Sequence, residues 1–389
     1  MALPPDLPPS SEIETLTALD AALASGRPLH GLRLQDLDLT AHCDQLLART
    51  DLEGVVVLGG QLPPELDEHL RAHGALIFPT DPHAPIDPYR AALYTPQELY
   101  AGLRERGYEA TPDYLAYEWV RDAERQHDAF VTLLRAIHDD SVSDALLEFV
   151  GDRPVVGVMG GHALGRGTDG YAAAARLGHT LAKAGLLVVT GGGPGAMEAA
   201  NLGALCENAI QLDDALERLA AVPSFRPSVQ DWALLALDIR DSITPSTEPT
   251  SLGIPTWFYG HEPPNVFCDG IAKYFSNAVR EDGLLARATG GLIVLEGAAG
   301  TVQEIFQAVT PRYYATDETP VPPLVLVGRD YWTRTVPVWP ALEALGRDRR
   351  LGKAVHLVDT AEEAARIICD LNPPIDPQLM PPPLTPPAR

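Results

Sequence analysis

A series of short apolar runs constrains the fold of this chain more than any other feature of its sequence. The runs lack the polar alternation of half-exposed strands, which indicates strands that are buried on both faces. Glycines and then a helical pattern follow the runs, and this succession is typical of a parallel, doubly wound sheet. We therefore predict an α/β, Rossmann-like fold with helices, such as Tyr171 to Ala184, on both faces of the sheet. The runs lie at 155–159, 186–190, 291–295 and 323–327, with a shorter one at 354–358.

A smaller α/β unit is predicted ahead of this sheet. Strand-like runs at 54–59 and 75–78 enclose a helical stretch at 64–73, and helical patterns then dominate to about residue 150. One of these, Asp113 to Arg135, has the mixed charges of an amphipathic, partly exposed helix. The eight prolines of residues 373–389 predict an extended tail. The predicted domains are an N-terminal α/β and helical unit (1–150), for which regulation and assembly are the open alternatives, the Rossmann-like domain (151–371) and the Pro-rich tail (372–389).

The charge and cysteine content exclude several classes of function. With 29 Lys and Arg against 53 Asp and Glu, the formal net charge is -24, so long nucleic acids and anionic membranes are not expected as partners. The four cysteines lie far apart without metal-ligand spacing, which predicts neither a metal site nor a disulfide framework. Neither a signal peptide nor a transmembrane run is apparent, and a reducing cytoplasm is the expected location.

Three glycine-rich turns follow strands of the larger sheet, and ligands bind at the carboxyl edge of such sheets. Glycines there either make only tight strand-to-helix turns or let the backbone approach a ligand. Three such turns at one edge favour a nucleotide or sugar-phosphate pocket, because the amides that open a helix attract phosphate. The residues assigned to this pocket are Gly160 and Gly161 in the first turn, Gly191, Gly192, Gly193, Gly195, Met197 and Glu198 in the second, and Gly297, Gly300 and Thr301 in the third.

Two familiar nucleotide motifs are missing from these turns. The stretch from Gly191 to Gly195 lacks the GxGxxG spacing, and no acidic residue follows it at a strand end about 20 residues on, so NAD is not favoured. No Walker A loop is present, which weighs against ATP hydrolysis. No metal or organic cofactor is expected.

Glu304 and Arg280 are the candidate catalytic residues. Thr301 and Glu304 have the spacing of a helix capping box, which is one interpretation of the third turn. In the other interpretation, Glu304 lies at the mouth of the pocket, where a carboxylate stabilises positive charge on a ribose or activates water, as glycosyl hydrolysis requires. Arg280 is expected to end a helix that begins near Phe267, where it either complements the helix dipole or contacts the ligand.

The loop before this helix is rich in aromatic and polar residues. Trp257 and Phe258 are expected in the core. Tyr259, His261 and Asn265 are candidates for contact with a base or ribose.

Two of the turns resemble motifs of a known family. The stretch from Gly191 to Glu198 is similar to the GGGxxGLMG motif of the LOG family, whose members are often mislabelled as lysine decarboxylases. The stretch from Gly297 to Glu304 is similar to the family's PGGxGTxxE motif, and the resemblance spans roughly residues 150 to 371. Residues 251–263 and 280–285 look closest to larger bacterial members, the nucleotide 5'-monophosphate nucleosidases with extra flanking domains.

This resemblance implies a cytoplasmic phosphoribohydrolase that forms homodimers or larger assemblies. Its substrate would be a nucleoside 5'-monophosphate, of the cytokinin riboside type or an ordinary nucleotide such as AMP, and its products a free base and ribose 5-phosphate. Glu304 matches the motif glutamate that acts on the ribose, and Arg280 matches an upstream arginine, although the spacing differs by about one residue. Glu296 and Ala298 depart from the motif's proline and glycine. The alternative is a nucleotide-binding or carrier protein of the same fold that does not cleave its ligand.

Overall fold

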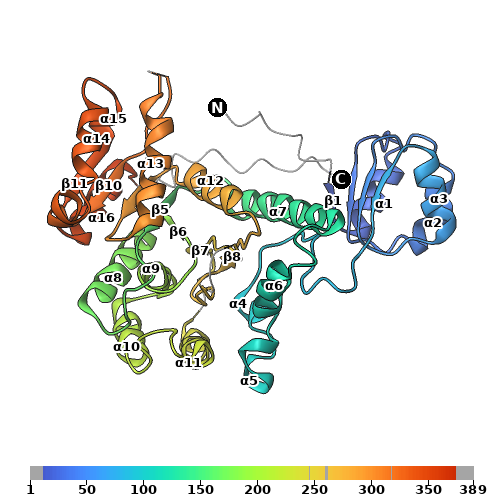
Figure 1. Ribbon diagram of the computed structural model, residues 1–389. Coiled ribbons are helices and arrows are strands. Elements are labelled where there is room, and N and C mark those ends of the chain that lie inside the picture. The colour runs from blue at the N-terminus through green and yellow to red at the C-terminus, as the bar shows by residue number, and fades with distance from the viewer. Residues whose placement is uncertain (1–11, 245, 259–261, 317, 374–389) are drawn as a thin grey trace.

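The chain folds around two parallel β-sheets, which we describe from a computed structural model over residues 12–244, 246–258, 262–316 and 318–373 (Figure 1). The larger sheet has seven strands in the order β11-β10-β9-β5-β6-β7-β8, and all of its pairings are parallel. This confirms the predicted α/β, Rossmann-like architecture. Its strands are β5 (Val155–Met159), β6 (Leu187–Thr190), β7 (Ser251–Gly253), β8 (Gly270–Ile271), β9 (Gly291–Val294), β10 (Leu324–Val327) and β11 (Val355–Val358).

The smaller sheet has four parallel strands in sequence order and a hydrophobic core of its own. Apolar side chains such as Leu19, Leu34 and Leu66 fill that core, each at most 4% exposed. The sequence identified two of these strands but not the short first two. The elements of this unit are β1 (Glu12–Ile13), α1 (Leu16–Ala24), β2 (Arg33–Gln35), α2 (Cys43–Leu47), β3 (Val56–Leu58), α3 (Pro64–Ala72) and β4 (Leu76–Phe78).

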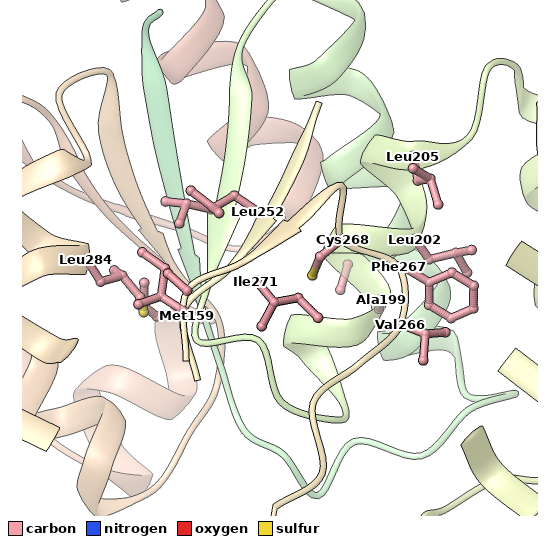
Figure 2. Packing of buried hydrophobic residues seen from close by; sticks show 14 of the residues in the cluster. Met159, Ala199, Leu202, Leu205, Leu252, Val266, Phe267, Cys268, Ile271 and Leu284 are labelled. Carbon is pink, nitrogen blue, oxygen red and sulfur yellow. The ribbon is translucent and has the colours of Figure 1, made fainter. Parts of the chain in front are cut away.

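Helices cover both faces of the larger sheet, because its strands are apolar on both sides. One core cluster joins the strands to α8 (Asp169–Lys183) and α16 (Ala361–Leu371). The other holds side chains of α12 (Asn277–Arg287) and α13 (Ala299–Tyr313). Figure 2 shows part of this second cluster, in which Ala199 and Leu202 of α9 (Ala196–Leu205) lie near Phe267. The remaining helices of this part are α10 (Ala209–Leu219), α11 (Val229–Ser242), α14 (Trp339–Gly346) and α15 (Leu351–Ala354).

The segment between the two sheets packs on the larger one. Leu99, Tyr117 and Leu146 belong to the same core cluster as the strands of the larger sheet, and Tyr94 forms a β-bridge with Ile271. The long helix α7 (Ala129–Val150) runs between the two sheets in Figure 1. The division of the chain at residue 150 stays a prediction. The other helices of this segment are α4 (Pro96–Leu99), α5 (Leu103–Arg106) and α6 (Pro112–Arg121).

Two helix predictions were wrong. The single helix expected over Asp113 to Arg135 is two helices, because α6 ends at Arg121 and Asp128 caps the start of α7 by accepting from the Val131 N–H at 2.9 Å. The helix expected from Phe267 begins only at Asn277. Arg280 therefore lies in the first turns of α12 and not at its C-terminus.

Within the described ranges, no helix is long and apolar enough to cross a membrane.

Candidate functional site

A pocket of about 940 Å³ lies at the carboxyl edge of the larger sheet. It crosses the edge from α12 and α13 on one face to α8 and α16 on the other, above β5, β9, β10 and β11. The position fits the ligand site of an open α/β sheet, at the point where the order of strands reverses. Of the predicted site residues, Gly160, Gly161, Met197, Arg280, Gly297, Gly300, Thr301 and Glu304 line this pocket.

Arg280 and Glu304 meet at one side of this pocket. Nη1 of Arg280 donates a hydrogen bond to Oε1 of Glu304 at 3.2 Å, which joins α12 to α13. The two side chains are only 12% and 14% exposed. A carboxylate and a guanidinium that are nearly withdrawn from water interact more strongly than a surface pair, so the protein holds both groups in a defined arrangement.

Burial raises the pKa of Glu304 above its usual value. The guanidinium of Arg280 opposes this rise, whereas the carboxylates of Glu281 and Glu262 add to it. A carboxylate with a raised pKa is more basic than a solvated one and therefore suits proton transfer or the orientation of water.

The capping-box interpretation of Thr301 and Glu304 was wrong. Helix α13 begins at Ala299 with Ala298 at its cap position, so Thr301 is the third residue of the helix and Glu304 lies a turn further on. The first amides of a helix have no acceptor within it, and here they open beside the pocket. A side chain at Gly300 would meet no atom within 4 Å, which shows that the backbone is open at this point.

The first and second turns lie directly against each other. A Cβ at Gly195, whose φ is +75°, would come within 2.6 Å of the Gly161 carbonyl oxygen. The Ala196 N–H donates to that same oxygen at 3.2 Å. A Cβ at Gly191 would lie 2.8 Å from Sδ of Met197 and 3.6 Å from Nη2 of Arg280. The glycines therefore allow two turns and the Arg280 side chain to share a small volume.

Asn265 holds the second turn and is not a ligand contact, which corrects our interpretation of the preceding loop. Its side chain is fully buried, and Nδ2 donates to the Gly193 carbonyl at 3.1 Å and to Asn201 Oδ1 at 3.0 Å. Its backbone N–H donates to the Gly192 carbonyl at 2.8 Å. Trp257 is in the core as expected, whereas Phe258 is 62% exposed. Tyr259 and His261 lie outside the described residues.

Glu198, in the second turn, forms a buried ion pair with Arg166. Both of its carboxylate oxygens accept from Arg166, one of them from Nε at 3.1 Å, and each side chain is 1% exposed. Glu198 lines a smaller cavity of about 210 Å³, together with His162 and Gly195. Gly192 and Gly193 face Pro255 and Met197. The described residues that line the larger pocket do not include Gly191, Gly192, Gly193, Gly195 or Glu198, so the assignment of these five residues to the pocket remains a prediction.

Most of the charged residues that line the larger pocket are carboxylates. Oε1 of Glu296 lies 3.1 Å from the point that a Cβ of Gly328 would occupy, so this exposed side chain leans toward the turn after β10. Glu262 pairs with His162, which also lines the pocket, with 3.1 Å between Oε1 and Nδ1. Among the described lining residues, Arg280 is the one arginine or lysine. The acidic lining residues are Asp169, Glu262, Glu281, Glu296, Glu304, Asp359 and Glu362.

The sequence did not identify Glu262, Glu281 or Tyr331 as pocket residues. The hydroxyl of Tyr331 donates to the Gly297 carbonyl at 2.8 Å and so steadies the third turn. Glu281 follows Arg280 directly in the sequence, and this adjacency could have indicated that Glu281 also lies at the pocket. In the described parts of the chain, no group of three or more His, Cys, Asp or Glu side chains is placed to hold a metal ion.

Comparison with known proteins supports the broader resemblance. Residues 153–212 match the model of the SLOG cluster4 family. This segment holds the first two glycine-rich turns, and the match supports the SLOG and LOG-like superfamily without deciding for the LOG family itself. No curated protein matches the chain.

Two solved structures are similar to part of the chain. The molybdenum cofactor carrier protein of Chlamydomonas reinhardtii is 17% identical, with 57% of this chain and 98% of that chain covered and a TM-score of 0.34. The molybdenum cofactor binding protein of the phototrophic bacterium Rippkaea orientalis is also 17% identical, with 57% and 99% covered and a TM-score of 0.34.

Proposed function

We propose that this chain is a nucleoside 5'-monophosphate phosphoribohydrolase. In the proposed reaction, water adds to the anomeric carbon of the ribose, the N-glycosidic bond breaks, and the base leaves with a proton, giving free base and ribose 5-phosphate. The observation that carries the proposal is the sheltered Arg280–Glu304 pair, which adjoins the open amides at the start of α13.

The phosphate would dock on the turn from Gly297 to Thr301. Unpaired amides and the positive end of the helix attract an anion there, and Gly300 leaves room for it. Binding energy from the phosphate would fix the ribose beside Glu304. The Glu304 carboxylate would then stabilise the oxocarbenium-like ribose and orient the attacking water, while Arg280 would hold the phosphate or assist departure of the base.

A second candidate is a protein of the same fold that holds a nucleotide without cleaving it. The departure at Glu296 favours this alternative, because it places an exposed carboxylate where the motif of the cleaving family has proline. The pairing of Glu304 with Arg280 also favours it, since a carboxylate that stays paired is less available to the ribose.

Incubation of the purified protein with a panel of nucleoside 5'-monophosphates tests the proposal. Free base and ribose 5-phosphate are followed by chromatography, and turnover should be abolished by Glu304→Gln. Glu217→Gln, which changes an exposed glutamate on α10, is the matched control and should retain activity. Retained turnover in Glu304→Gln would refute the assignment. A higher melting temperature with AMP, without release of base, would favour the binding protein.

The cytoplasmic location and the homodimer or larger assembly belong to this proposal. Light scattering coupled to size-exclusion chromatography tests the assembly.

A further inference from the structure

Glu281 is a buried carboxylate beside the Arg280–Glu304 pair. Its side chain is 6% exposed, and its Oε1 lies 4.0 Å from Nη1 of Arg280. Oε1 of Glu304 lies 3.2 Å from the same nitrogen. Two carboxylates on different helices therefore approach one nitrogen of one guanidinium.

Glu281 is held in this position from both helices. Nδ2 of Asn277, one turn earlier on α12, donates to Oε1 of Glu281 at 2.7 Å. Nε2 of Gln303 on α13 donates to Oε2 at 2.7 Å. Both oxygens thus accept a hydrogen bond, so the side chain of Glu281 is fixed between α12 and α13.

We propose that Glu281 is a positioning residue that shares the Arg280 guanidinium with Glu304 and thereby keeps Glu304 available as a base. A carboxylate in a close, two-oxygen pair with arginine is strongly stabilised as the anion and is a poor base. Glu304 has one oxygen bonded to Arg280, and the neighbouring negative charge of Glu281 weakens the field that Glu304 feels. The catalytic part of this inference rests on the proposed function.

The charged groups around Glu304 come from three segments. Helix α12 contributes Arg280 and Glu281, and the segment after residue 261 contributes Glu262, which pairs with His162 of the first turn. Glu281 is the one carboxylate among them that adjoins Arg280 in sequence and touches it in space. Its removal should therefore change the electrostatic interactions of the Glu304 carboxylate without disturbing the Glu262–His162 pair.

The neighbouring Asp282 provides a matched control. It also lies on α12 and also accepts from a glutamine of α13, with Nε2 of Gln307 at 2.5 Å from its Oδ1. Its side chain is exposed and is not among the described residues that line the pocket. Glu281→Gln and Asp282→Asn each remove one negative charge and weaken one bond between the same two helices.

The test is a titration of Glu304 in protein labelled with ¹³C at the glutamate carboxyl carbon, with the resonance assigned through Glu304→Gln. Glu281→Gln should move the midpoint of Glu304 to lower pH by about one unit, because a neighbouring negative charge is lost. Asp282→Asn should leave the midpoint in place. If Glu281→Gln does not fold, Glu281→Met is the second neutral variant, and Glu281→Asp should retain the wild-type midpoint. An unchanged midpoint in the neutral variants, or an equal shift in Asp282→Asn, would overturn the inference.

Where the protein releases base from a nucleotide, the acid limb of kcat/KM should move to lower pH in Glu281→Gln by the same amount. A protein without turnover would refute the proposed function, while the titration would still decide the role of Glu281.

Discussion

Oδ2 of Asp139 accepts a hydrogen bond from the backbone N–H of Ser276 at 2.7 Å. Oδ1 of the same carboxylate accepts from the Phe275 N–H at 2.9 Å, and Ser276 caps α12. A side chain on α7 therefore fixes the start of the helix that carries Arg280. The segment before residue 150 thus supports the candidate site from outside the larger sheet.

Asp139→Asn should destabilise the protein. An amide in this position places an NH₂ group against a backbone donor, and Asp139 is only 4% exposed. We expect a loss of about 2 kcal/mol in the free energy of unfolding, since a buried bond to a charged group is broken. Urea denaturation measures this loss. The neighbouring Asp140, with a side chain 66% exposed, is the control, and Asp140→Asn should change stability by less than about 0.5 kcal/mol. Equal losses in both variants would contradict the capping role.

Gly300→Ala should weaken nucleotide binding without loss of stability. A methyl group there meets no atom within 4 Å, and alanine is the better helix former. The methyl group would occupy the space in front of the α13 amides, so we expect the affinity for a nucleoside monophosphate to fall about tenfold, which corresponds to one lost hydrogen bond to a charged group. Calorimetry measures the affinity.

Gly283→Ala is the control for this variant, because Gly283 lies in α12 with the same open surroundings. It should keep the wild-type affinity. Equal affinities in the two variants would argue against phosphate at the third turn.

Asn265→Ala should unfold more readily than the wild type. Loss of the side chain removes the hydrogen bonds to the Gly193 carbonyl and to Asn201 Oδ1 in a buried site, at a cost of about 2 kcal/mol. Asn201→Ala should behave alike, because Asn201 also bonds Thr190 at 2.6 Å and Ser251 at 2.8 Å in the same network. Thermal unfolding measures both. Unchanged stability with weaker nucleotide binding would restore Asn265 as a ligand contact.

The larger sheet could be predicted because a strand that is buried on both faces has a recognisable local sequence pattern. An uninterrupted apolar run such as Val155 to Met159 shows this pattern within five residues. No comparable sequence pattern indicates where α12 begins. Phe267, Ile271, Tyr274 and Phe275 have helical spacing, yet they are buried by contacts with other segments, and the helix begins where Ser276 and Asp139 cap it.

The candidate site could be predicted in part for the same reason. The glycine-rich turns and Glu304 belong to sequence motifs that directly follow strands. Their position at the carboxyl edge of the sheet therefore follows from the parallel arrangement of those strands. The Arg280–Glu304 contact joins residues 24 positions apart, and the hydrogen bond from Gln303 to Glu281 joins residues 22 positions apart. Such contacts depend on how α12 packs on α13, which local patterns do not encode.

Glu12 should make the stability of the protein depend on pH. It lies on β1 beside Arg33, which also bonds Asp144 of α7 at 2.7 Å. Burial raises the pKa of Glu12 from 4.5 to about 7, with Arg33 opposing the rise and Asp144 adding to it. A carboxyl with a higher pKa in the folded state binds its proton more tightly there, so its contribution is fully present below pH 4.5 and is lost as the pH rises to about 7.

Glu12→Gln keeps the neutral form at every pH and should therefore remove this loss. We expect the variant to gain in melting temperature over the wild type at pH 8 and to differ little from it near pH 4.5, as thermal unfolding at the two pH values would show. Glu53→Gln, at an exposed glutamate of the same unit, is the control. An equal difference from wild type at both pH values would mean that Glu12 is ionised in the folded protein, with its attraction to Arg33 outweighing the cost of burial.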